Sequence, residues 1–62
     1  MAFVKTTEDL KIGDKVKTTQ RHESLSGYFE VGTDVTIIDI SGRGYDIQDD
    51  EGNRIIEVGW II

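Results

Sequence analysis

The sequence predicts an all-β domain, a small barrel or a sandwich, for three reasons. Residues 35–40 are an almost unbroken row of β-branched side chains, which fit a packed, pleated surface better than a helix. Short apolar runs elsewhere are separated by turn-forming Gly, Asp, Asn and Ser. With 62 residues the chain can build one small core, so we expect a single domain over residues 1–62.

The composition narrows the class of protein further. A domain of this size buries roughly 60% of the surface that its unfolded chain exposes, so its stability is marginal. The chain has no Cys, which excludes disulfides and thiolate metal sites and is typical of a reducing compartment. No apolar run approaches the roughly 20 residues that cross a bilayer, and the first residues lack a signal-peptide pattern. We therefore expect a cytoplasmic protein with no membrane partner.

The formal charge of −5 is unevenly distributed along the chain. Residues 1–22 contain five Lys or Arg and three acids, a net charge of +2, whereas the remaining residues contain two Arg and nine acids, a net charge of −7. A net acidic protein of this size is repelled by a polyphosphate unless its cations gather on one face. A protein is therefore the expected partner, and nucleic acid is the second choice.

The central strand is predicted to contain a β-bulge. In an ideal strand Val35 and Ile37 lie on one face, and Ile38 and Ile40 lie on the other. A plain amphipathic strand keeps its apolar side chains on one face, so an extra residue or strong coiling is needed midway.

The segments on either side of the central strand are predicted from their polarity and their glycines. We expect a strand at residues 15–18 with Lys15 and Lys17 on its solvated face. Residues 19–27 are polar, lack a usable periodicity and end in Gly, so they are predicted to be the longest loop. Residues 41–44 are predicted to form a tight turn. A long loop in so small a domain is commonly functional or mobile.

The last third of the chain predicts a hairpin and a closing segment. Residues 45–49 and 54–58 are expected to pair around a type I turn at residues 50–53, which ends in a left-handed Gly. A 3₁₀ turn at residues 59–60 and a short strand at residues 61–62 are expected to follow.

One pattern recurs: an apolar residue, any residue, an apolar residue, Gly, two residues and an apolar residue. It occurs at residues 10–16, 29–35 and 56–62, and its spacings of 19 and 27 residues exclude a solenoid repeat. We interpret it as repeated turn chemistry. Gly takes a positive φ that redirects the strand, while the flanking apolar residues stay in one core.

This order of elements resembles the Src-homology-3-like barrel over residues 10–62. That family has a strand, a long irregular loop, a diverging turn, a central strand, a distal hairpin and a 3₁₀ turn before a short last strand. The corresponding segments here are the long loop 19–27, the diverging turn 29–32, the distal hairpin 50–53 and the 3₁₀ position 59–60. The resemblance implies a barrel of five strands with a 3₁₀ turn before the last one.

The motifs of proline-rich peptide binding are replaced in this chain. Signalling domains of the family carry an Ala-Leu-Tyr-Asp-Tyr-like stretch, paired tryptophans and a Pro-Ser-x-Tyr motif. At the comparable places this chain has Lys-Val-Lys-Thr-Thr, Gly44-Tyr45 and Val58-Gly59-Trp60. The chain looks more like small single-domain barrels of bacteria and phages, including translation- and transcription-factor modules with a Gly-Asp-x-Val opening. That resemblance implies binding of RNA or protein.

Aromatic residues are the first candidates for a binding face. Phe29 is expected in the core, whereas Tyr45 and Trp60 are equally compatible with the core and with an exposed pair beside the long loop. If the pair is exposed, Tyr45→Ala or Trp60→Ala should abolish partner capture and leave the melting temperature nearly unchanged. A large loss of stability in both variants would place them in the core.

Catalysis is not expected from this sequence. His22, the one histidine, lies in a polar stretch and is expected to be solvated rather than to act as a base. No Ser lies in a nucleophile-elbow context, and a small barrel fills its interior with side chains. The acids at residues 46–51 lack the spacing of a calcium loop, so no metal or cofactor is predicted.

We therefore predict a small, non-enzymatic protein-interaction module, monomeric or homodimeric. Its predicted binding face is the loop of residues 20–28 with Tyr45 and Trp60, and the predicted partner-binding residues are Gln20, Arg21, His22, Tyr28, Tyr45 and Trp60. Two alternatives are an acidic inhibitor that occupies a basic groove on its partner, and a barrel that binds nucleic acid. The nucleic-acid alternative would use Lys11, Lys15, Lys17, Arg21 and Arg43.

Overall fold

The computed structural model describes residues 10–62 and shows an all-β fold of six strands in two antiparallel sheets. The all-β class is confirmed, but the described residues form six strands where five were expected, and they contain no helix. The strands are β1 (Lys15–Lys17), β2 (His22–Ser24), β3 (Gly27–Phe29), β4 (Asp34–Ser41), β5 (Gly44–Gln48) and β6 (Arg54–Ile55).

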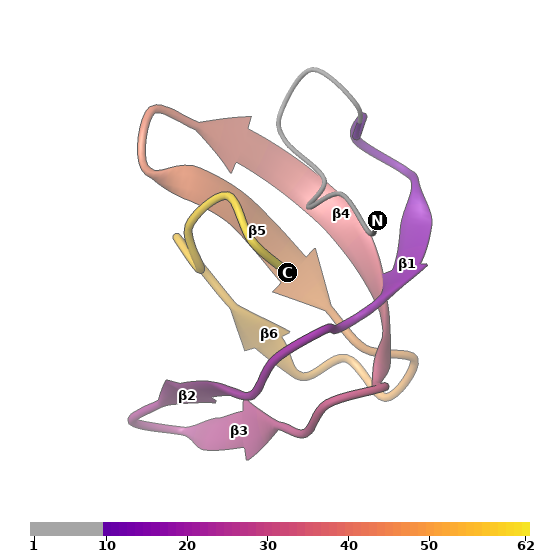
Figure 1. Cartoon of the computed structure of the whole chain (residues 1–62), viewed down its shortest axis with the longest axis vertical. Coiled ribbons are helices and arrows are strands. Elements are labelled where there is room, and N and C mark those ends of the chain that lie inside the picture. The colour runs from indigo at the N-terminus through magenta and orange to yellow at the C-terminus, as the bar shows by residue number, and fades with distance from the viewer. Residues whose placement is uncertain (1–9) are drawn as a thin grey trace.

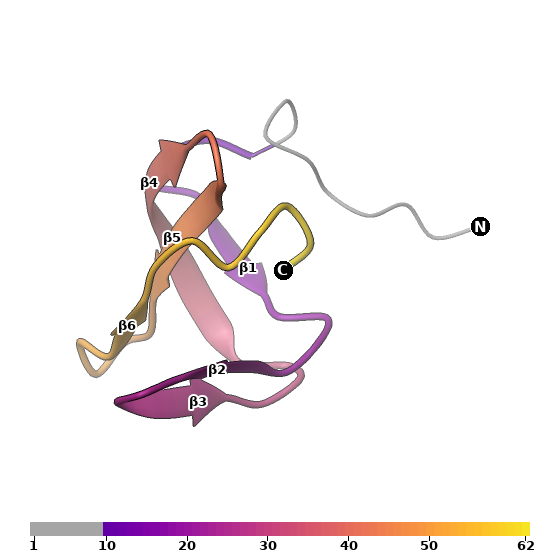
Figure 2. The same ribbon diagram turned by 90° about the vertical axis from the view of Figure 1, so that its left-hand side faces the viewer.

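The larger sheet has the strand order β1-β4-β5-β6, and the smaller sheet is the β2–β3 hairpin. Strand β1 pairs with the first part of β4, with Val16 opposite Val35, and β4 then continues to pair with β5. In both views the hairpin forms one end of the molecule, and β4 extends from its neighbourhood toward the opposite end (Figures 1 and 2).

Strand β4 contains the predicted bulge. Its register with β5 shifts between Ile37 and Asp39, which leaves Ile38 as the extra residue. Val35 and Ile37, before the shift, are fully buried, and Ile40, after the shift, packs against the core while partly exposed. The bulge therefore lets one strand contribute apolar side chains to the core on both sides of the shift.

Both sheets and the C-terminal segment contribute to a single core. Phe29 is buried, as predicted, and it brings the hairpin into contact with the larger sheet. Among residues 10–62, the buried apolar residues are Leu10, Phe29, Val35, Ile37, Tyr45, Ile47, Ile55 and Ile62. So small a core leaves little reserve of stability, so each large side chain in it matters.

The prediction of a long loop at residues 19–27 is wrong, because this stretch contains β2 and the turn of the β2–β3 hairpin. His22 pairs with Phe29, and Ser24 pairs with Gly27. The Ser24 hydroxyl donates a hydrogen bond to the Gly27 carbonyl at 3.2 Å and so helps close the turn. One residue of β2 is buried and the other two are exposed, so a strand this short carries no visible apolar alternation.

The 3₁₀ turn predicted at residues 59–60 and the strand predicted at residues 61–62 are also wrong. Glu57 has a φ of 54° and Gly59 has a φ of 90°. These left-handed conformations interrupt any run of helical or extended residues. For the same reason the strand predicted at residues 54–58 shortens to the two residues of β6.

The recurring glycines are turn positions, as predicted. Gly13, Gly32 and Gly59 have φ values of 98°, 86° and 90°. The expectation that the apolar residues beside them stay in the core is wrong for Ile12, Val31 and Ile56, which are 61%, 65% and 59% exposed. Ile12 and Val31 lie directly before their glycines, and Ile56 lies three residues before Gly59.

The turn predicted at residues 50–53 joins β5 to β6 and is organised by Asp49. The Asp49 carboxylate accepts hydrogen bonds from the Asn53 side chain at 2.9 Å and from the Glu51 and Asn53 amides at 3.0 and 2.8 Å. These bonds, first the one from the Asn53 side chain, hold the pKa of Asp49 below its ordinary value of 3.8. Gly52, with a φ of 90°, completes the turn.

Gly44 marks a close approach between β5 and the C-terminal segment. A Cβ placed on Gly44 would overlap the backbone N, Cα and O atoms of Gly59. Two backbone hydrogen bonds hold the two segments together, from the Tyr45 amide to the Gly59 carbonyl at 3.1 Å and from the Val58 amide to the Tyr45 carbonyl at 3.0 Å. No side chain fits between them at this point.

We expect Gly44→Ala to destabilise the protein by at least about 2 kcal/mol, because it adds a methyl group against Gly59 and strains a positive φ. Gly42→Ala is the matched control, since a Cβ there meets nothing within 4 Å. It should change the free energy of unfolding by less than about 0.5 kcal/mol. Urea unfolding measures both variants, and equal midpoints would contradict the close approach.

Candidate functional site

Gln20 and His22 contact the C-terminal segment rather than facing a partner. The Gln20 side-chain amide donates to the Ile61 carbonyl at 3.1 Å, and His22 Nε2 lies 2.9 Å from the Ile62 carbonyl oxygen. The Thr19 amide donates to the same Ile62 oxygen at 2.7 Å. His22 is only 7% exposed, so the prediction that it is solvated is wrong. Its position opposite Phe29 turns it to the inner face of the hairpin.

Tyr45 is fully buried, so it cannot belong to an exposed aromatic face. Trp60 is 37% exposed, and its ring meets the Tyr45 ring edge to face, with 5.5 Å between the ring centroids. Tyr45 lies at the start of β5, which is buried against the C-terminal segment. Of this predicted pair, Trp60 alone is accessible to a partner.

Arg21 and Tyr28 contact each other on the hairpin, and both are exposed. The Arg21 guanidinium carbon is 4.4 Å from the centroid of the Tyr28 ring, within the range of a cation–π contact. Arg21 also reaches Glu23 at 2.9 Å and Glu30 at 3.6 Å. The guanidinium therefore holds the Tyr28 ring in place while that side chain stays 56% exposed.

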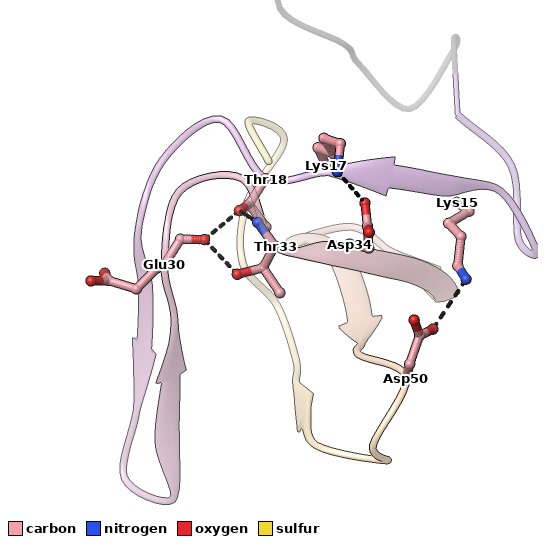
Figure 3. Close-up of polar contacts among 7 residues, drawn as sticks. All are labelled: Lys15, Lys17, Thr18, Glu30, Thr33, Asp34 and Asp50. Atoms are coloured by element: carbon pink, nitrogen blue, oxygen red, sulfur yellow. Dashed lines mark hydrogen bonds and ion pairs between the residues drawn. The ribbon is translucent and has the colours of Figure 1, made fainter.

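A buried threonine fixes the base of the hairpin (Figure 3). The Thr18 hydroxyl donates to the Glu30 carbonyl at 2.6 Å and accepts the Thr33 amide at 3.0 Å. The Thr33 hydroxyl donates to the same Glu30 carbonyl at 2.7 Å. These bonds join the segment after β1 to the turn between β3 and β4, and so set the direction in which the hairpin leaves the sheet.

Two adjoining hollows separate the hairpin from β6, and together they form the surface that we call the hairpin cleft. The cleft is defined by residues 23–29 and 52–56. Ser24, Ser26, Arg54 and Ile55 line both hollows, which makes the cleft continuous. The hairpin and the β6 side of the larger sheet thus line opposite sides of one cleft.

The hairpin cleft presents apolar side chains to solvent. Leu25, at the tip of the hairpin, is fully exposed, and Ile56, just after β6, is 59% exposed. Both line the same hollow, so the two side chains face a shared space from separate elements. Exposed large apolar side chains gathered at a hollow mark an interaction site more often than scattered ones do.

Four of the five cations considered for nucleic-acid binding are paired with carboxylates. The hydrogen bond from Lys17 lowers the pKa of Asp34 below its ordinary value of 3.8, and Figure 3 shows this pair beside Lys15 and Asp50. The pairs are Lys15–Asp50 (3.1 Å), Lys17–Asp34 (2.8 Å), Arg21–Glu23 (2.9 Å) and Arg43–Glu57 (3.8 Å).

Within residues 10–62, no group of His, Asp and Glu side chains is arranged to hold a metal ion. In the same range no helix is long and apolar enough to cross a membrane. Comparisons of the chain with protein-family models, with curated proteins and with solved structures find no match. The site therefore has to be interpreted from its own geometry.

The predicted site residues do not lie together in the structure, and the hairpin cleft contains residues that were not predicted. Gln20 and His22 are bound to the C-terminal segment and Tyr45 is in the core, so of the six only Tyr28 lines the cleft. Sequence reasoning placed the binding face in the loop of residues 20–28 without singling out Leu25, and it missed Arg54 and Ile56. An isolated Leu in a polar stretch was the available signal for Leu25. Arg54 and Ile56 carry no signal, because their role depends on a neighbour distant in sequence.

We expect Tyr45→Ala to destabilise the protein by about 3–5 kcal/mol, because it empties a large volume in a small core. Trp60→Ala should cost about 1 kcal/mol, since its ring is partly exposed and loses chiefly the contact with Tyr45. Thermal and urea unfolding measure both variants. A Tyr45→Ala variant that melts at the wild-type temperature would contradict this assignment.

Proposed function

We propose that this protein is a small, non-enzymatic interaction module that binds a protein partner through the hairpin cleft. The observation that carries the proposal is the pair of exposed apolar side chains, Leu25 and Ile56, which face one hollow from two separate elements. Burying them would remove apolar surface from water, which is the main driving force of protein association. Tyr28, held by Arg21, adds an aromatic side chain at low entropic cost.

We further infer that the fold is a variant of the Src-homology-3-like barrel. The antiparallel order β1-β4-β5-β6, the turn at residues 30–33 and the hairpin around residues 50–53 support this relation. The β2–β3 hairpin takes the place of the long loop in that family. The relation favours the cleft as the binding surface, because the long loop flanks the binding groove in such barrels.

The charges of the described residues favour a protein over a nucleic acid. Four of the five cations considered for phosphate binding are already paired with carboxylates, and phosphate contacts would have to displace them. The same ion pairs engage five of the acids, which are Glu23, Glu30, Asp34, Asp50 and Glu57. An inhibitor that relies on a free acidic face is therefore less well supported.

The test is capture by the immobilised protein from lysate of the source organism, with and without nuclease treatment, at low and high salt. Wild type should retain a defined protein in each condition, and Leu25→Asp should lose it. Val31→Asp is the matched control, because Val31 is also exposed but lies outside the cleft, and it should retain the partner.

Two results would contradict the proposed function. The first is retention of the same protein by wild type and Leu25→Asp. The second is recovery of nucleic acid alone, without nuclease treatment, with release by a moderate increase in salt. Circular dichroism of both variants checks that each remains folded.

A further inference from the structure

We propose that the hairpin cleft binds an extended peptide segment, which adds to the edge of β6 and places a carboxylate against Arg54. This inference rests on the proposed function and specifies the chemistry of its partner. It follows from three features of the cleft. These are an open strand edge, a cation without a carboxylate partner, and a hollow lined by an apolar residue that lies two positions after that cation.

The first feature is the free edge of the larger sheet. Among the described strands, β6 is the last in the order β1-β4-β5-β6, so it has one hydrogen-bonded neighbour there. The hairpin lies beside its other edge, but the described residues form no backbone hydrogen bond between the hairpin and β6. An edge strand with an adjoining hollow is the usual acceptor of an added peptide strand.

The register shows which backbone groups point to that edge. The Asp49 amide donates to the Asn53 carbonyl at 2.9 Å, so the backbone groups of these two residues face each other across the β5–β6 pair. In an antiparallel ladder, hydrogen-bonded pairs alternate with pairs that are not hydrogen-bonded. The next pair, Gln48–Arg54, is therefore not hydrogen-bonded, and the pair after it, Ile47–Ile55, is. The amide and carbonyl of Arg54 therefore point outward, toward the hairpin cleft, and those of Ile56, the residue after β6, form no backbone hydrogen bond within the described residues.

The second feature is the charge of Arg54. Arg21, Arg43 and the two lysines of β1 each have a carboxylate partner, but Arg54 has none within residues 10–62. It lines both hollows and is exposed. The one carboxylate that lines the cleft, Glu23, is already paired with Arg21. An incoming carboxylate would therefore find a guanidinium free to pair with it.

The third feature is the spacing of Arg54 and Ile56. The two residues flank the buried Ile55, and both line the same hollow. A peptide strand paired with this edge would place two of its own residues, also two apart, opposite Arg54 and Ile56. The first would be acidic, and the second would be a large apolar residue that fills the hollow between Ile56 and Leu25.

The experiment is selection of a phage-displayed library of random decapeptides on the immobilised protein. We expect enrichment of peptides with Asp or Glu two residues from Leu, Ile, Val or Phe, in either order. Arg54→Glu should weaken the selected peptide at least about tenfold, as charge-assisted hydrogen bonds require. The same peptide with Lys in place of its acid should bind Arg54→Glu better than it binds wild type. Arg43→Glu, at a turn outside the cleft, is the matched control and should bind normally.

The outcomes separate this inference from the proposed function. No enriched peptide, an enriched motif without an acid, or equal affinity for wild type and Arg54→Glu would overturn the peptide inference. If Leu25→Asp still abolishes capture of a protein from lysate, the cleft then binds a folded surface and the proposed function survives. Undiminished peptide binding by Leu25→Asp would place the peptide elsewhere and also overturn the inference.

Discussion

The buried hydroxyl of Thr18 holds the two parts of this fold in register. It joins the segment after β1 to the turn between β3 and β4, through the Glu30 carbonyl and the Thr33 amide. Thr18 is 2% exposed, so its hydroxyl cannot turn to water instead, and leaving it unpaired would cost about 1–3 kcal/mol. Because the hairpin emerges from this junction, the width of the cleft beside β6 depends on it.

The C-terminal segment provides a second tie across the same region. The Ile62 carbonyl accepts the Thr19 and Gln20 amides at 2.7 and 3.2 Å and lies 2.9 Å from His22 Nε2, while the Ile62 side chain is buried in the core. One residue thus links the base of β2 to the core of the larger sheet. The hairpin is held as a wall of the cleft, which lowers the entropic cost of binding there.

Sequence reasoning succeeded where the local pattern decides the structure. The bulge in β4, the turn around Gly52 and the positive φ of the three recurring glycines depend on residues within a few positions of each other. The burial of Phe29 follows from its size. These features need no knowledge of which strands become neighbours.

The predictions that were wrong depended on contacts between distant segments. His22 is buried because the hairpin turns it toward Ile62, forty residues away, and its polar neighbours in sequence give no sign of this. Tyr45 is buried because the C-terminal segment closes over the start of β5. The strand predicted at residues 54–58 ends early because Glu57, a residue that rarely takes a positive φ, adopts one, and its amide donates a hydrogen bond to the Asp46 carboxylate at 2.8 Å. The cleft could not be predicted, since its walls meet only in the folded chain.

The central claim is that β6 presents an open edge to the cleft, and amide hydrogen exchange of the wild-type protein tests it most directly. The Ile55 and Tyr45 amides should exchange slowly, because each is paired across the sheet or with the C-terminal segment. The Arg54 and Ile56 amides should exchange near the rate of an unstructured chain. Slow exchange at Arg54 and Ile56, comparable to that at Ile55, would show that this edge is already occupied and would contradict the account.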